Sequence, residues 1–115
     1  MPQHIVKLEG KYMIWSTIVD APVYFGMSLE TLRKLWRAEY GRVGLPDLER
    51  RLQRVEATGT DSPVYASPGA LIAGNRAGPG ESELSFDEVV EFYVRQLRQP
   101  EPSPLKRYRQ RKAAG

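Results

Sequence analysis

Residues 4–19 read HIVKLEGKYMIWSTIV, and this segment sets the architecture of the chain. Its two halves are rich in β-branched and aromatic residues, which favour strands. Glu9-Gly10 lies between the halves, and glycine readily adopts the positive φ that a tight hairpin turn requires. The segment therefore predicts an antiparallel β-hairpin with strands over residues 4–8 and 11–19.

The second of these strands is apolar on both faces. Side chains alternate along a strand, so Tyr12 and Ile14 lie on one face while Met13 and Trp15 lie on the other. Such a strand is either covered on both sides, or covered on one side and used for binding on the other. The second alternative makes Tyr12 and Trp15 candidate contacts for a partner.

Three or four helices follow the hairpin. Residues 20–22 (DAP) interrupt the apolar pattern, and residues 23–25 form either a short edge strand or a packed loop. Apolar residues at helical spacing predict a first helix between residues 28 and 41, with a serine N-cap and a terminal glycine. A second helix between residues 46 and 59 begins with proline, and a short third helix lies between residues 67 and 75.

The last helix has the clearest start signal. Ser85 and Glu88 form a capping box, in which each side chain accepts a hydrogen bond from the other residue's backbone N–H, and Leu84 and Val89 occupy the positions of a hydrophobic staple. Pro100 is expected to end the helix. Its predicted buried face comprises Phe86, Val89, Val90, Tyr93, Val94 and Leu97.

These elements predict an α+β fold, in which an N-terminal antiparallel β-hairpin, with or without a third short strand, packs with three to four helices. A chain of 115 residues has room for one domain, which we expect over residues 1–99. Residues 100–115 contain recurring prolines followed by basic residues. We interpret this segment as an extended or disordered tail, because alternate prolines disfavour both helix and β-ladder.

Composition restricts the location and the class of function. Apolar residues make up 41% of the chain and charged residues 27%, which is ordinary for a globular protein. Cysteine is absent and the N-terminus lacks the layout of a signal peptide, so we expect a cytoplasmic protein. No apolar run approaches the roughly twenty residues that a membrane span needs. Residues 1–100 carry 12 Lys and Arg against 13 Asp and Glu, so the net charge of +3 arises in the tail.

The sequence contains no group of residues that predicts catalysis. His4 is the only histidine, so a Ser-His pairing would have to include it, and we interpret it as a polar residue at a strand edge. The usual zinc ligand sets cannot be assembled without cysteine and with one histidine. Asp87, Glu88 and Glu91 favour a helix start and lack the spacing of a calcium or magnesium loop. We therefore expect no enzyme activity, no metal and no cofactor.

Residues 74–81 (GNRAGPGE) form the most distinctive loop. Glycine exposes backbone N–H groups and Arg76 offers a forked donor, which is one way to hold an anion. The loop lacks the Lys-Ser/Thr end of a phosphate-binding Walker loop, and it leads into a carboxylate-rich segment. We therefore favour a structural connector whose glycines serve positive-φ turns, with Arg76 pairing to Glu81 or Glu83.

Two further groups of cations are candidate partner contacts. Arg50, Arg51 and Arg54 share a face of the second predicted helix, although the acidic residues of that helix cancel much of their field and favour a solvated surface. The tail offers either a partner contact or a solubilising end. Its candidate residues are Lys106, Arg107, Tyr108, Arg109, Arg111 and Lys112.

Residues 4–8 (HIVKL), 15–22 (WSTIVDAP) and 74–79 (GNRAGP) resemble small uncharacterised accessory proteins of actinobacterial viruses. The excess of 12 arginines over 5 lysines fits the GC-rich genome of such a virus. The resemblance covers about half of the chain and implies a setting, since virus-encoded proteins of this size commonly bind a host component or join the particle. It implies no site residues.

The leading hypothesis is a non-enzymatic interaction protein, viral in origin, whose folded body binds a host or virion protein with electrostatic help from the tail. The alternative is a nucleic-acid-binding module that acts mainly through the tail cations. An RNA-stacking sheet is disfavoured, because one hairpin followed by helices does not give the βαββαβ order of an RRM. An enzyme that uses the Arg76 loop is the third reading, and self-association is left open.

Overall fold

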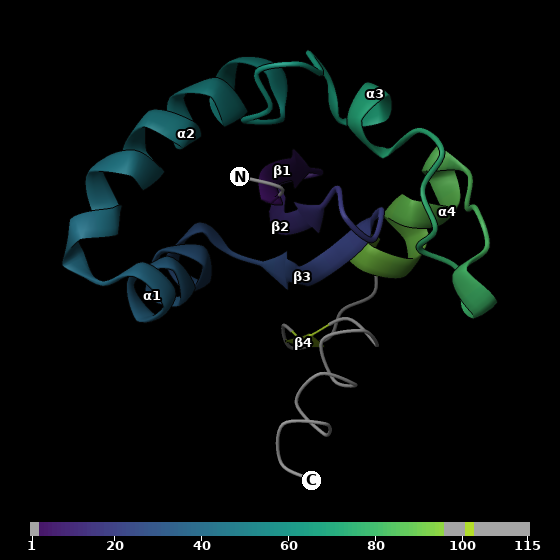
Figure 1. The fold of residues 1–115 in the computed structure, drawn as a ribbon, viewed down its shortest axis with the longest axis horizontal. Coiled ribbons are helices and arrows are strands. Elements are labelled where there is room, and N and C mark those ends of the chain that lie inside the picture. The colour runs from purple at the N-terminus through teal and green to yellow at the C-terminus, as the bar shows by residue number, and fades with distance from the viewer. Residues whose placement is uncertain (1–2, 96–100, 103–115) are drawn as a thin grey trace, which may run out of the picture.

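The hairpin forms at the predicted place and makes up the first two strands of an antiparallel sheet with the strand order β1-β2-β3-β4, in which β1 is an edge strand (Figure 1). A computed structural model describes residues 3–95 and 101–102. The strands are β1 (Gln3–Leu8), β2 (Lys11–Ser16), β3 (Ala21–Met27) and β4 (Glu101–Pro102). Leu8 faces Lys11 in the register, and both turn residues take positive φ, with 49° at Glu9 and 78° at Gly10.

The second strand is shorter than the sequence predicts. It ends at Ser16, which faces Ala21 across a four-residue turn, instead of continuing to residue 19. Asp20 takes a positive φ of 55°, a conformation that aspartate tolerates better than most residues, and the Ser16 hydroxyl accepts the N–H of Ile18. Apolar content alone suggested a longer strand, but local turn chemistry ends it.

Of the two readings for residues 23–25, the strand is confirmed and extends over residues 21–27. The expectation that prolines 102 and 104 exclude the tail from a β-ladder is wrong for residues 101–102. Phe25 faces Glu101 and Tyr24 faces Pro102 at the outer edge of β3. Proline is tolerated at an edge strand because no further strand requires its missing N–H. This pairing places part of the predicted tail on the sheet.

The first three helices begin within a residue of the predicted positions, and the first two end at the predicted glycines. Helix α1 (Leu29–Tyr40) has a Ser28 N-cap that accepts the N–H of Thr31, and α2 (Leu45–Thr58) follows a 3₁₀ turn, η1 (Arg42–Gly44). Helix α3 (Pro68–Ile72) precedes a short 3₁₀ turn, η2 (Pro79–Glu81). The described part of the chain thus has an α+β fold.

The last helix starts where the sequence predicts, but its second half is π-helical instead of α-helical. Both hydrogen bonds of the Ser85–Glu88 capping box are present in α4 (Phe86–Val90), which continues as a π-helical turn, η3 (Glu91–Arg95). Phe86 was expected in the buried face, but its ring is exposed and lies beside Gly69 of α3. The predictions for Leu97 and for a helix end at Pro100 fall outside the described residues.

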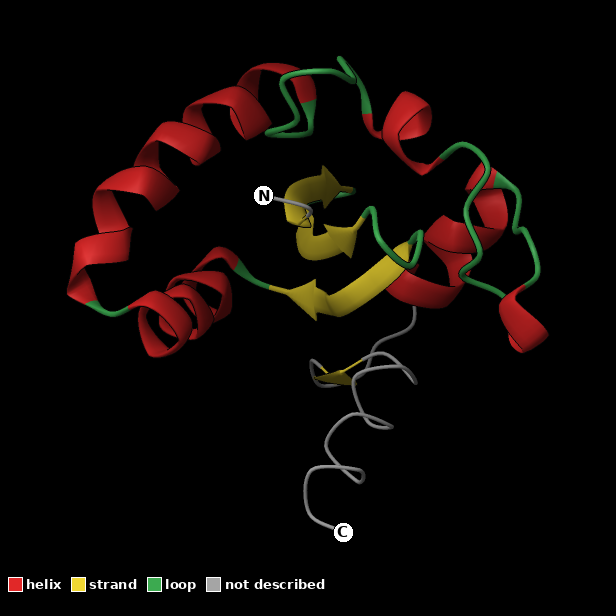
Figure 2. Ribbon diagram, viewed as in Figure 1, coloured by secondary structure: helices red, strands yellow, loops and turns green. Residues whose placement is uncertain are grey.

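Helices cover the sheet on both faces. Figure 2 shows α1 and α2 on one side of the strands and α3 and α4 on the other. Ile5, Tyr12 and Ile14 belong to the core under α1 and α2, whereas Met13 and Trp15 belong to the core under α3 and α4. Tyr12 and Trp15 are 4% and 1% exposed, so the interpretation of these two side chains as partner contacts is wrong. The apolar content of both strand faces reflects two cores.

Candidate functional site

A hollow of about 240 Å³ lies where β1, α2 and the segment after α2 meet. Five of its seven lining residues are charged, which distinguishes it from the two apolar cores. It is lined by His4, Asp47, Arg50, Arg51, Arg54, Asp61 and Pro63. The hollow therefore gathers the three arginines that the sequence singled out, together with the one histidine and two carboxylates.

Asp61 forms the buried end of this site. Its carboxylate has no exposed surface; one oxygen accepts the backbone N–H of Ile5 at 2.9 Å and the other accepts Nη1 of Arg51 at 2.8 Å. The backbone N–H of Asp61 donates to the Ile5 carbonyl at 3.1 Å, and Lys7 N–H donates to the Gly59 carbonyl at 2.9 Å. These bonds satisfy the outer edge of β1, which would otherwise offer backbone groups to another strand.

Arg51 bonds both carboxylates of the hollow. Its Nε lies 2.9 Å from Oδ2 of Asp47, its Nη1 bonds Asp61, and its guanidinium lies 5.3 Å from the ring centroid of Trp36. Burial lowers the pKa of Arg51, but the bonds to Asp47 and Asp61 outweigh burial and raise it overall. The same bond from Arg51, helped by Arg50, lowers the pKa of Asp47. These bonds hold Arg51 in place, and the prediction of a solvated face is wrong for this side chain, which is 17% exposed.

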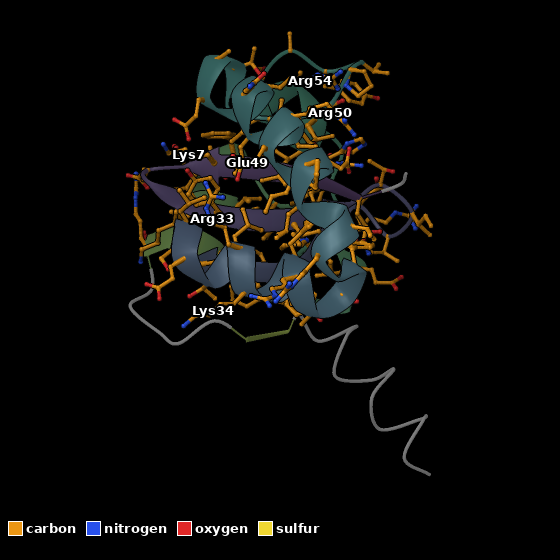
Figure 3. All side chains as sticks on the ribbon, turned by 90° about the vertical axis from the view of Figure 1, so that its left-hand side faces the viewer. Lys7, Arg33, Lys34, Glu49, Arg50 and Arg54 are labelled. Atoms are coloured by element: carbon orange, nitrogen blue, oxygen red, sulfur yellow. The ribbon has the colours of Figure 1, made fainter. Side chains whose placement is uncertain are left out.

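Arg50 and Arg54 line the hollow from the exposed side of α2. They are four residues apart, hence one helical turn, and both project from the helix (Figure 3). The Arg50 side chain is 74% exposed and lies 3.3 Å from Oδ1 of Asp47, and Arg54 donates to the Asp61 carbonyl at 3.4 Å. Each guanidinium has five N–H donors, so most of the donor capacity of both arginines remains for a ligand.

His4 lies against the buried carboxylate. Its Nδ1 is 3.3 Å from Oδ1 of Asp61, but the angles are not those of a hydrogen bond, and this buried atom has no hydrogen-bond partner in the described structure. A histidine beside an aspartate is the orienting half of a catalytic triad. Among the described residues that line the hollow, none carries a hydroxyl or thiol. The neighbouring Ser62 hydroxyl accepts the N–H groups of Val64 and Tyr65, which gives it a turn-forming role.

Arg76 lies apart from this site. It is exposed, its backbone N–H donates to the Asp20 carbonyl at 2.8 Å, and within residues 3–95 it forms no ion pair with Glu81 or Glu83, so the predicted pairing is wrong. The loop is organised by Asn75, which is buried. Its amide donates to the carbonyls of Ile72 and Leu84 and accepts the N–H groups of Ala77 and Leu84. This network agrees with the connector reading.

Sequence reasoning missed Asp61 and Asn75. Both are polar residues in irregular segments, and their partners are set by tertiary contacts, 56 positions away for the Ile5–Asp61 bond. The candidate tail residues 106–109, 111 and 112 lie outside the described residues.

No helix in the described part of the chain has the length and apolar character to cross a membrane. In the same residues, no three histidine, cysteine, aspartate or glutamate side chains are grouped to hold a metal ion. Comparison of the chain with protein-family models, with curated proteins and with solved structures found no match.

Proposed function

We propose that this protein is a non-catalytic binding module that docks on an acidic segment of a protein partner through Arg50 and Arg54. The observation that carries the proposal is the charge balance of the hollow. Arg50, Arg51 and Arg54 carry three positive charges against the two carboxylates of Asp47 and Asp61, so the hollow keeps a surplus of one positive charge on its Arg50 and Arg54 side. Complementary charge of this kind steers an acidic partner and fixes its register.

A protein partner is favoured over a polynucleotide by the charges outside the hollow and by the side chains next to it. Away from the hollow, cations pair with acids: Arg33 with Glu49 and Lys34 with Glu30 on α1 and α2, and Lys7 of β1 with Glu56 of α2 (Figure 3). These pairs leave little unbalanced positive charge there for a phosphate backbone. Next to Pro63, the side chains of Val64 and Tyr65 are exposed, which suits the apolar and aromatic contacts of a protein interface.

The resemblance to small viral proteins makes a host or virion protein in the cytoplasm the partner that we propose. The tail cations add long-range attraction to an acidic surface, which raises the association rate more than it raises specificity. The alternative function is nucleic-acid binding through the tail. It predicts that affinity depends on the tail cations and not on Arg50 and Arg54, so substitutions in the two groups distinguish the two functions.

The test measures the binding of a fluorescent polyglutamate peptide and a fluorescent oligonucleotide to the full chain by anisotropy. Arg50→Glu/Arg54→Glu should weaken peptide binding at least about 10-fold, since each charged hydrogen bond contributes about 1.5–3 kcal/mol. The matched control Arg37→Glu/Arg42→Glu changes the net charge by the same amount at exposed residues that do not line the hollow. It should weaken peptide binding less than about 2-fold, because these residues attract the peptide only through the net charge of the protein.

A third variant replaces the tail cations at positions 106, 107, 109, 111 and 112 with glutamine. Our proposal predicts weakened but retained peptide binding. Near-complete loss of oligonucleotide binding in this variant, with no effect of the Arg50/Arg54 change on either probe, would support the nucleic-acid alternative and reject the proposed docking surface. A steep fall of affinity with rising salt would accompany that outcome.

A further inference from the structure

The hollow has the size of a site for one chemical group. Pockets that enclose whole small-molecule ligands usually measure about 300–1,000 Å³, whereas this one measures about 240 Å³ and opens to solvent on the side of Arg50 and Arg54. A group of a few heavy atoms, presented at the end of a side chain, fits that volume. The rest of the partner then remains on the surface around α2 and Pro63.

The donors in the hollow exceed what one carboxylate accepts. A carboxylate has two oxygens in one plane and matches a single guanidinium fork. Arg50 and Arg54 of α2 present two forks one helical turn apart, and the His4 imidazole lines the hollow from β1. A phosphate monoester has three terminal oxygens and a charge of about −1.5 to −2 at neutral pH, so it can engage both forks at once.

The carboxylates of the site do not prevent this binding. Asp61 is buried and saturated by Ile5 and Arg51, and Asp47, at the rim, accepts from both Arg50 and Arg51. The Arg50–Asp47 contact is 3.3 Å long and largely exposed, so a doubly charged ligand competes with it favourably. Arg51 keeps its bonds to both carboxylates, and Arg50 can turn toward the ligand.

We infer that the hollow binds the phosphate monoester of a phosphorylated serine or threonine on the protein partner; this inference rests on the proposed docking function. A phosphodiester is a poorer match, because it has two terminal oxygens and a single charge.

The test is an NMR titration of the full chain with N-acetyl-O-phosphoserine amide, N-acetylglutamate amide and dimethyl phosphate at pH 7.5. Phosphoserine should give saturable shifts at the side-chain Nε–H signals of Arg50 and Arg54 and at α2 amides, with affinity at least about fivefold higher than for the other two probes. Arg50→Gln and Arg54→Gln should each weaken it at least about fivefold, which corresponds to about 1 kcal/mol. Arg37→Gln, on α1, is the matched control and should change it less than about twofold.

Equal affinity for phosphoserine and glutamate, or shifts that the Arg50 and Arg54 substitutions do not reduce, would overturn the inference. Tighter binding of dimethyl phosphate would point to a nucleic acid and also reject it. If phosphoserine fails while polyglutamate binding still depends on Arg50 and Arg54, the proposed docking function stands without phosphate recognition. If both fail, the hollow is not a binding site.

Discussion

The buried carboxylate of Asp61 accepts the backbone N–H of Ile5 at 2.9 Å, and the backbone N–H of Asp61 returns a bond to the Ile5 carbonyl. This reciprocal pair ties the segment after α2 to the outer edge of β1. Val6 and Thr60 form a β-bridge beside it. The same aspartate thus closes one edge of the sheet and holds Arg51 under the hollow, so the stability of the fold and the geometry of the site depend on one side chain.

Replacement of Asp61 should destabilise the protein more than replacement of an exposed acid. Asp61→Ala leaves Arg51 partly buried with one carboxylate fewer and Ile5 N–H without its acceptor, and breaking a buried ion pair in this way costs about 3–5 kcal/mol. The measurement is the free energy of unfolding in urea. Glu83→Gln, an exposed carboxylate with no bond in the described structure, should change it by less than about 0.5 kcal/mol. If Asp61→Ala lowers the free energy of unfolding by less than about 1 kcal/mol, the edge of β1 is covered without the Asp61 side chain.

In the loop of residues 74–81, two adjacent residues should differ in their contribution to stability. Asn75 is 3% exposed and its amide serves four backbone groups, so Asn75→Ala leaves several buried donors and acceptors without partners and should cost about 2–4 kcal/mol. Arg76→Ala, one residue later, should change the free energy of unfolding by less than about 0.5 kcal/mol, because only its backbone N–H is used. Similar effects of the two substitutions would contradict the assigned role of Asn75.

Trp15 is a core residue and not a recognition residue. Trp15→Ala should lower the free energy of unfolding by about 3–5 kcal/mol, because a side chain that is 1% exposed leaves a large cavity when it is removed. Ile18→Ala, in the adjacent turn and 70% exposed, is the matched control and should be nearly neutral. Should Trp15→Ala retain full stability and lose polyglutamate binding, the docking surface would have to include the sheet.

The predictable parts of the fold rest on local chemistry. The Glu9-Gly10 turn, the Ser28 cap and the Ser85–Glu88 box each involve residues within four positions, so their partners are visible in the sequence. Local patterns do not predict features that depend on tertiary contacts. Apolar content on both faces of β2 was equally consistent with a binding face and with two cores, and only the placement of α3 and α4 distinguishes them.

The sequence predicts which arginines share the candidate site, but it does not predict the hollow that they line. Arg50 and Arg54 follow from helical spacing, but their surplus charge depends on Arg51 being bonded to Asp47 and Asp61. The bond between Arg51 and Asp61 forms only where β1 and the segment after α2 come together. No pattern in the sequence around Asp61 predicts that contact. The sequence also predicts that the acids of α2 offset much of the arginine charge, and Asp47 does pair with both Arg50 and Arg51.

Tyr93 gives the fold a defined response to alkaline pH. Burial raises the pKa of its hydroxyl, which donates to the Ala77 carbonyl at 2.6 Å, and its ring lies edge-on to Phe25 at 4.9 Å. A pKa that is higher in the folded chain than in the unfolded chain means that ionised tyrosine favours unfolding. The contribution of Tyr93 is therefore complete below pH 10, the ordinary tyrosine value, and is lost as the pH rises through the folded-state value.

Tyr93→Phe removes both the hydrogen bond and the titration. At pH 8 it should cost about 0.5–1.5 kcal/mol, because the Ala77 carbonyl loses its donor. Above pH 10 the gap between the two proteins should narrow, since wild type loses the Tyr93 contribution and the variant has none to lose. Urea unfolding at intervals from pH 8 to 11 measures the gap, and Tyr65→Phe, on an exposed ring, controls for the general effect of removing a phenol. A gap that stays constant across that range would mean that Tyr93 ionises as readily in the folded chain as in the unfolded one, and that the contact with Ala77 does not hold its proton.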